Sequence, residues 1–226
     1  MSIKYQEFHP IMGETLNDSN TILMDMSEKN PDLKKIDLLD TIVFEEYINK
    51  LLKQSSKRFG VGGYLEQRNI YQRSTVFKES SDSKFRNIHL GIDIWSYTNS
   101  QVYCPFDGVV HSFQDNKGFG NYGPTIILEH FWQGETIYSL YGHLSTKDLK
   151  SLSVGQSILK GENIGHLGSS IENGNWPPHL HFQMIRNLEN KQGDYPGVCS
   201  SSEKEKYKEN CPNPASWLGI PANVIY

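Results

Sequence analysis

The chain has 226 residues, of which 37% are hydrophobic and 21% charged, and its formal net charge is −4 with a pI near 6.1. This composition is typical of a globular protein, and it lacks the basic excess that nucleic-acid-binding proteins carry. The length falls within the range of one large domain, so we expect one main domain with extensions.

The N-terminal stretch MSIKYQEFHPIMGETLND contains no apolar run of signal-peptide length and no small-residue cleavage site. No stretch of the sequence is apolar for long enough to span a bilayer. A cytoplasmic location is therefore the default expectation, with export only by a non-classical route or if the sequence is trimmed. The three cysteines, Cys104, Cys199 and Cys211, form no CxxC motif and are expected to be free thiols. A Cys199–Cys211 bridge stays open for a secreted protein.

Residues 1–61 are expected to form a helical N-terminal extension. The stretch DLKKIDLLDTIVFEEYINKLLKQSSKRFG has apolar residues at helical spacing, which predicts one or two amphipathic helices ending at Gly60. The apolar positions are Leu33, Ile36, Leu39, Ile42, Val43, Tyr47, Leu51 and Leu52.

From Gly62 the pattern changes to short β-rich stretches separated by Gly, Asn and Asp, among them VYCPFDGVVHSF, PTIILEHFW, TIYSLYGH and HLHFQMI. Such stretches are typical of a mainly antiparallel β protein, and we assign residues 62–188 to this domain. Residues 189–226 contain turn residues and a charged run, and they are expected to form an irregular C-terminal extension packed on or near it.

Two histidines stand two residues apart in PPHLHFQM. On a strand, His179 and His181 emerge on the same face, about 6.5–7 Å apart along the strand. The pair therefore points at one place, although an HxH pair alone is a weak signal for a metal.

The stretch NIHLGIDIW carries His89 and Asp93. Gly91 and the β-branched isoleucines argue against a helix, so we expect an extended segment with a local kink, in which the two side chains can converge. Zinc accepts histidine nitrogen and carboxylate oxygen, and a catalytic zinc site has three protein ligands and one position for water. His89, Asp93 and one histidine of the HLH pair would complete that set.

His143 lies in YGHLS, at the end of an apolar stretch. A histidine beside a metal but outside its coordination shell can move a proton or donate to an oxyanion. Taken alone, His143 reads as an ordinary packed histidine, and HxxxD reads as a turn cap. The conjunction of the three motifs, each at the end of a β stretch, favours a site.

The ordered set IHLGIDIW, CPFDGVV, YGHLS, VGQSILKGENIGHLG and WPPHLHF resembles the lysostaphin/LytM-type zinc metallopeptidases, the family of glycyl-glycine endopeptidases and related murein hydrolases. The similarity covers about the middle half of the chain. It implies the family's fold, an antiparallel β-sandwich-like arrangement called the duplicated hybrid motif, and makes residues 62–188 a LytM-like zinc peptidase domain.

Carried over position by position, the resemblance implies one zinc ion per chain, held by His89, Asp93 and His181. His143 and His179 then match the two catalytic histidines that do not bind the metal. One would accept the proton of the attacking water while the other stabilises the oxyanion, and the sequence leaves their assignment open. The implied activity is hydrolysis of peptide bonds in peptidoglycan cross-bridges or stem peptides. His130 matches a position that is usually structural.

Two other functions stay open. A cytosolic zinc amidase or peptidase with a non-murein substrate is favoured by the acidic charge and by the lack of a wall-binding repeat. The stretches GGYLEQRNIY and GDYPGVC also look similar to a peptidase-like domain in large cytosolic proteins that continue into aminotransferase-type enzymes. A non-catalytic LytM-like module that binds and regulates a partner is the second alternative, but such modules usually lack metal ligands. The expected partner is a peptide or peptidoglycan-derived substrate, without nucleic acid or a membrane span.

Four aromatic residues flank the motifs and could line a substrate groove, or could simply pack: Tyr64, Tyr71, Trp95 and Trp176. In some relatives a pro-segment fills the open metal position. Asn17, Asn20 or Asn30 could do so here, whereas a helical cap on the sheet is the alternative.

Overall fold

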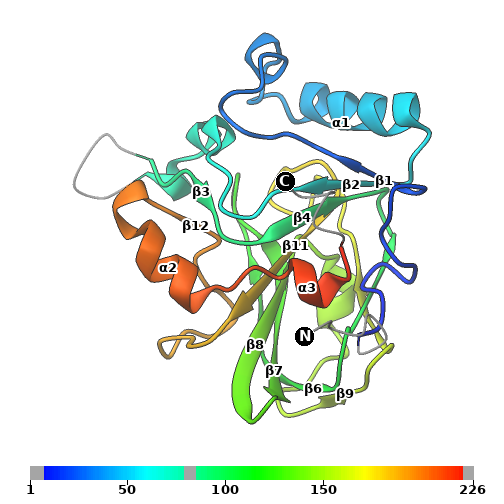
Figure 1. Cartoon of the computed structure of the whole chain (residues 1–226), viewed down its shortest axis with the longest axis vertical. Helices are drawn as coiled ribbons and strands as arrows, with labels where there is room; N and C mark the ends of the chain where they lie inside the picture. Colours follow the sequence, from blue (N-terminus) through cyan, green and yellow to red (C-terminus); the bar gives the residue numbers. More distant parts are fainter. Residues whose placement is uncertain (1–7, 79–84, 221–226) are drawn as a thin grey trace.

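The structure, a computed structural model, describes residues 8–78 and 85–220 (Figure 1). Its centre is an eight-stranded sheet in which every neighbouring pair is antiparallel except the first, which is parallel. The predicted mainly antiparallel β architecture is confirmed. In spatial order the strands are β1 (Thr21–Leu23), β2 (Phe59–Gly62), β4 (Ile92–Trp95), β11 (His179–Ile185), β8 (Glu135–Gly142), β7 (Gly123–Trp132), β6 (Gly108–Asn116) and β9 (Ser157–Ile158).

Two small antiparallel sheets complete the β structure of the described residues: β5 (Gln101–Tyr103) with β10 (Asn163–His166), and β3 (Ile88–His89) with β12 (Val198–Cys199). The α-helices are α1 (Thr41–Ser55), α2 (Lys204–Asn210) and α3 (Ala215–Leu218). Short 3-10 helices cover Leu33–Lys35, Asn69–Arg73, Thr75–Phe77, Thr146–Leu149 and Ser201–Glu203.

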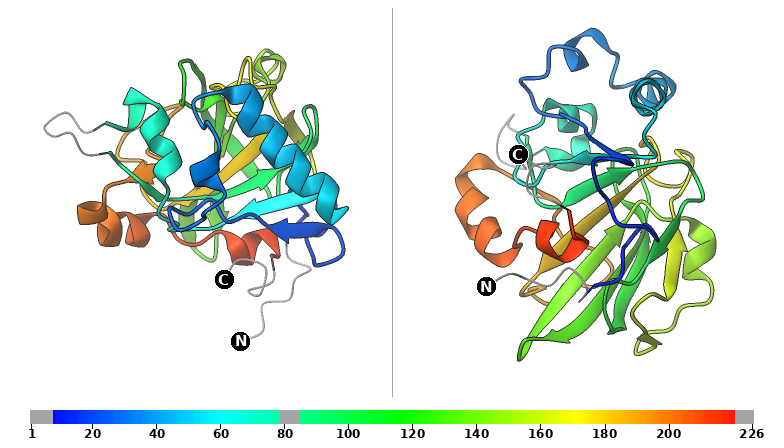
Figure 2. Two further views of the ribbon diagram at one scale, coloured as in Figure 1. Left: turned by 90° about the horizontal axis from the view of Figure 1, so that it is seen from above. Right: turned by 45° about the vertical axis from the view of Figure 1, so that its right-hand side comes forward.

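Helix α1 lies over the β1–β2 edge of the sheet (Figures 1 and 2). It begins after Asp40, whose carboxylate accepts hydrogen bonds from the first-turn backbone, and it ends where Ser56 adopts a left-handed conformation with φ of 55°. The predicted end at Gly60 is wrong, because Gly60 already belongs to β2.

The buried face of α1 consists of Phe44, Ile48 and Leu52, spaced four residues apart. Burying each of these side chains contributes roughly 1.5–3 kcal/mol. Ile42, which the sequence pattern placed on the apolar face, is 70% exposed. The helical extension is present, but its contact face is rotated from the predicted one.

Strands β4 and β11 are buried on both faces. Their apolar face, with Ile92, Ile94 and Phe182, belongs to the main core cluster under the sheet. The other face is mostly polar and is buried as well, and its residues are Asp93, Trp95, His179, His181, Gln183 and Ile185. A polar, covered face in the middle of a sheet is where the candidate site lies.

The division into an extension 1–61, a domain 62–188 and an extension 189–226 stays a prediction. The first segment contributes β1 and most of β2 to the central sheet, and the third contributes β12, α2 and α3. The charged run KEKYKEN, predicted to be irregular, forms helix α2, and Trp217 of α3 joins the main core.

All three cysteines are free and buried, so the predicted free thiols are confirmed and the Cys199–Cys211 bridge is not formed. Across residues 8–78 and 85–220, no helix has the length and apolar character needed to cross a membrane.

Candidate metal centre

Strand register brings the first two site residues together. Asp93 on β4 lies directly opposite His181 on β11, so both side chains stand on the same face of the sheet. His89 comes from β3, and the chain bends at Leu90 and Gly91 before β4 begins. A Cβ atom at Gly91 would lie 2.6 Å from the Phe182 carbonyl oxygen, so glycine permits this approach. The predicted kink between His89 and Asp93 is therefore present.

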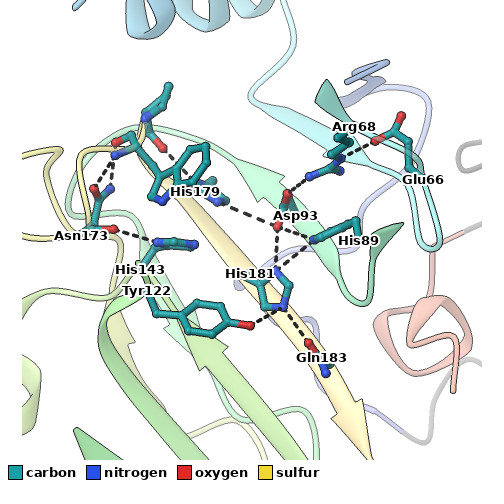
Figure 3. Close-up of polar contacts among 12 residues, drawn as sticks. Glu66, Arg68, His89, Asp93, Tyr122, His143, Asn173, His179, His181 and Gln183 are labelled. Carbon is teal, nitrogen blue, oxygen red and sulfur yellow. Dashed lines mark hydrogen bonds and ion pairs between the residues drawn. The ribbon is translucent and has the colours of Figure 1, made fainter. Parts of the chain in front are cut away.

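Three side-chain atoms converge at this point (Figure 3). His89 Nε2 lies 3.0 Å from His181 Nδ1, and Asp93 Oδ1 lies 3.2 Å from His89 Nε2 and 3.1 Å from His181 Nδ1. Ligands about 2.0–2.1 Å from a tetrahedral zinc ion stand about 3.3 Å apart. The three atoms thus form a triangle close to one face of such a tetrahedron.

Hydrogen bonds on the far side of each ring fix which nitrogen carries the proton. His89 Nδ1 lies 2.9 Å from the Gly63 carbonyl oxygen, which can only accept, so Nδ1 is the protonated atom. His181 Nε2 lies 2.9 Å from Gln183 Oε1, and the Gln183 amide nitrogen donates to Pro196 O and Cys211 Sγ. Both facing nitrogens therefore carry lone pairs, which point with a carboxylate oxygen at one place. Three atoms that converge with free lone pairs, and with no proton between them, are a suitable set of ligands for a metal ion.

The outer oxygen of Asp93 is held by Arg68. Arg68 Nη1 donates to Asp93 Oδ2 at 2.5 Å, and its Nε donates to Glu66 Oε2 at 2.6 Å. The Arg68 side chain is 3% exposed. Burial acts to raise the pKa of Asp93, but its interactions with His89 and with the Arg68 guanidinium outweigh burial and hold that pKa well below its usual range. Arg68 therefore keeps the carboxylate ionised and leaves Oδ1 to face the histidines.

His143 and His179 stand beside the triangle, with ring centroids 4.2 Å apart. His179 Nε2 is 3.9 Å from Asp93 Oδ1. His143 Nδ1 donates to the Asn173 carbonyl at 2.8 Å, and His179 Nδ1 donates to the Pro177 carbonyl at 2.7 Å. Each ring therefore has an Nε2 lone pair available. His143 adopts a left-handed backbone conformation, with φ of 64°, directly after β8.

All four histidines of the cluster are buried. Burial, reinforced by the neighbouring His179, holds the pKa of His143 well below its usual range, and burial also lowers the pKa of His179. Burial together with the Arg68 charge lowers the pKa of His89 to about 4. His89, His143 and His179 are therefore neutral at neutral pH, the form in which imidazole binds a metal or accepts a proton.

All five predicted side chains lie in one place, but the residues that orient these five side chains were not predicted. Glu66 and Arg68 lie in GGYLEQRNIY, a stretch noted for its similarity to other proteins rather than for its charges. Gln183 lies two residues after His181, and this HxHxQ spacing on one strand face was the available signal. Asn173 acts through its carbonyl oxygen, for which a sequence holds no signal.

The remaining predicted residues have other roles. Asn17, Asn20 and Asn30 bond within the N-terminal loops, where each amide nitrogen donates to a nearby backbone carbonyl. His130, predicted to be structural, is buried between the Asp107 carbonyl and the Ser139 hydroxyl. Tyr64 donates to the Cys211 carbonyl, whereas Tyr71, Trp95 and Trp176 line the cavity beside the histidines.

Among the solved structures to which this chain is similar are the following three. The catalytic domain of lysostaphin, an antimicrobial peptidase from Staphylococcus simulans, is 21% identical with a TM-score of 0.41, over 77% of this chain and 96% of that one. A zinc-containing peptidase from Vibrio cholerae is 24% identical with a TM-score of 0.37, over 47% of this chain and 29% of that one. A mutant catalytic domain of the prophage-encoded M23 protein EnpA from Enterococcus faecalis is 20% identical with a TM-score of 0.38, over 51% and 81%.

These TM-scores are all below 0.5. The chain spans less than a third of the Vibrio cholerae protein's length. No curated protein matches the sequence significantly. Residues 87–193 match the sequence model of Peptidase family M23, and all five predicted site residues lie within this stretch. The suspected family is thus confirmed: the chain carries, over residues 87–193, a domain of Peptidase family M23.

Proposed function

We propose that the chain is a zinc-dependent peptidase in which His89, Asp93 and His181 hold one zinc ion. The observation that carries the proposal is the convergence of two histidine lone pairs and a carboxylate oxygen, at separations of 3.0–3.2 Å, on the polar face of β4 and β11. Histidine nitrogen with one carboxylate is a donor set of catalytic zinc sites, and three protein ligands leave a position for water or substrate.

When bound, zinc would polarise the scissile carbonyl and make the attacking water more acidic. The chain's own residues do the rest. Arg68 keeps Asp93 ionised and turned toward the histidines, while the Gly63 carbonyl and Gln183 fix the tautomers of His89 and His181. These contacts set the ligand geometry before any substrate arrives.

His143 and His179 are proposed to move the proton. Both present an Nε2 lone pair, because each Nδ1–H is engaged with a carbonyl oxygen. One ring accepts the proton of the attacking water at Nε2 and, as imidazolium, returns it to the leaving amine. The other ring would stabilise the oxyanion that develops on the former carbonyl, by donating from an Nε2 that carries a proton. Either histidine fits either role.

The substrate is proposed to be a peptide or a peptidoglycan-derived peptide, cleaved at an amide bond. The non-murein zinc amidase or peptidase remains the alternative, since it requires the same five residues. A purely regulatory module is less well supported, because the side chains needed for metal binding and proton transfer are all present and oriented. The domain division into 1–61, 62–188 and 189–226 belongs to the same proposal.

Metal analysis of two alanine variants tests this assignment. His181→Ala should lose zinc and activity together, because it removes a ligand. His143→Ala should retain near one zinc per chain while turnover on a susceptible peptide falls by roughly 10²–10⁴-fold, the usual worth of a general base. His111→Ala is the matched control, because His111 is half-buried and bonds to the Ser112 hydroxyl instead.

Pentaglycine, purified peptidoglycan and a mixed peptide library serve as substrates for the zinc-loaded protein. Equal zinc loss in His143→Ala and His181→Ala would overturn the division of roles. A zinc-loaded wild-type protein that cleaves no amide bond in any of the three would overturn the peptidase function.

A further inference from the structure

One cavity of about 370 Å³ joins the histidine cluster to a second, apolar wall. Asp93, His143, His179 and His181 line part of it. Six uncharged residues of the lining we call the aromatic recess, and the same cavity is also lined by the charged residues Arg68, Arg86, Lys191 and Asp194. The recess consists of Met26, Phe44, Ile70, Tyr71, Phe77 and Trp176.

The recess is held in shape by contacts among its own members. The ring centroids of Tyr71 and Phe77 lie 4.7 Å apart, and that of Trp176 lies 6.4 Å from each. The Trp176 indole N–H donates to the Asn121 carbonyl at 3.1 Å. A preformed apolar surface of this kind loses little entropy when a ligand covers it.

Arg73 packs against two residues of the aromatic recess. Its guanidinium lies 4.7 Å from the centre of the Trp176 ring and 4.6 Å from that of Phe119, and it also packs on Phe44. Arg73 is buried, and its Nη2 donates to the Thr41 hydroxyl at the start of α1. The recess is therefore tied to both α1 and the loop before β7.

Five of the six recess residues come from before residue 87, outside the stretch that matches the family. Trp176 is the exception. The described residues before that stretch, 8–78, we call the N-terminal segment. The recess is thus formed mainly by the N-terminal segment, beside the site that the matched stretch supplies.

We propose that the aromatic recess is the subsite for a large apolar side chain, such as phenylalanine or leucine, on the substrate residue next to the scissile bond. The proposal rests on the proposed peptidase function and names its substrate class. Burying such a side chain is worth roughly 1.5–3 kcal/mol, or about ten- to hundredfold in affinity, and glycine has no side chain to bury. Glycine-only linkers are therefore poor ligands for this site.

Hydroxamates that chelate zinc test the preference without turnover. One series places phenylalanine, leucine or glycine on the acyl side of the zinc-binding group, and a second places them on the amine side. With the zinc-loaded full chain, calorimetry should give dissociation constants about ten- to hundredfold lower for phenylalanine than for glycine in one series. Equal affinities in both series would overturn the proposal.

Phe77→Ala, with exposed Phe131→Ala as its control, assigns the preference to the recess. Phe77→Ala should reduce the ratio of glycine to phenylalanine dissociation constants severalfold, because one wall of the recess is lost. The ratio is measured within one variant, so a change in folded fraction cancels. An unchanged ratio in folded Phe77→Ala would contradict the assignment.

The peptide amides Gly-Gly-Phe-Gly-Gly and Gly-Gly-Gly-Gly-Gly, followed through the Trp176 indole N–H resonance, separate this proposal from the function it rests on. A protein that holds no zinc and cleaves nothing, yet prefers the phenylalanine peptide, would retain the recess and overturn the peptidase. A protein that cleaves peptides but binds both pentapeptides equally would overturn the recess alone.

Discussion

The histidine side of the cavity and its aromatic side differ in how their residues are placed. On the histidine side, Asp93, His179 and His181 stand on paired strands, whose register sets their spacing. On the aromatic side, Tyr71 and Phe77 lie on short 3-10 turns of the N-terminal segment, where no sheet register applies. The reacting groups are thus set by the sheet, whereas the shape of the cavity around them is set by an irregular segment.

Arg68 gives the strongest test of this difference between the two sides, because it belongs to the N-terminal segment but contacts Asp93. Arg68→Met leaves the buried Asp93 carboxylate and the half-buried Glu66 carboxylate without their guanidinium partner, which should cost about 3–5 kcal/mol of unfolding free energy. Zinc affinity should also fall about 10–100-fold, as for other residues that orient a ligand. Urea denaturation and competition with a chelator measure the two effects.

Arg186→Met is the control, because Arg186 forms an exposed pair with Glu135, and this substitution should change stability by less than about 0.5 kcal/mol. Arg68→Lys retains the charge but not the planar fork that reaches both carboxylates, so it should recover part of the zinc affinity. Unchanged zinc affinity in Arg68→Met would show that the two sides are independent.

His130 provides a comparison with the histidines of the site, because it is a buried histidine of β7 with a structural role. Burial lowers its pKa to about 4, against 6.5 in the unfolded chain. The neutral form is favoured in the folded state, so this stabilisation is complete above pH 6.5 and is lost as the pH falls toward 4. Its full size is about 3 kcal/mol.

Urea denaturation at pH 7 and pH 4.5 measures this loss in the wild type and in His130→Gln. The variant should lose less stability over that range, because it lacks one of the buried groups that titrate. Identical losses in the two proteins would mean that His130 is not held neutral by the fold.

Gln183 gives the smallest of these effects, and it lies wholly on the histidine side. Gln183→Leu removes the acceptor that fixes the His181 tautomer, so zinc affinity should fall about 10-fold with the fold intact. Gln183→Glu restores an acceptor at the same place and should retain affinity. A chelator competition that ranks leucine and glutamate alike would contradict a tautomer-fixing role.

Much of the histidine side was predictable from the sequence, since a period of two on a strand and an HxxxD kink both translate directly into geometry. The β architecture followed from short β-rich stretches in the same way. The helix in residues 33–60 was predicted with the wrong face, because Ile42 fits an apolar pattern as well as Ile48 does and only packing distinguishes them. Tyr71 and Trp176 were named as candidates to line a groove, and both line the cavity. The rest of the aromatic recess and the role of Arg68 could not be predicted, because they depend on how an irregular segment folds back onto β4.

The pairing of β2 with β4 has a practical consequence for anyone preparing a shorter fragment. A piece trimmed to residues 87–193 would lose β2, and the backbone N–H and carbonyl groups of β4 on that side would face solvent. Open strand edges recruit other chains, so such a fragment is expected to self-associate. Recombinant work should therefore retain the N-terminal strands, even though the family match begins after them.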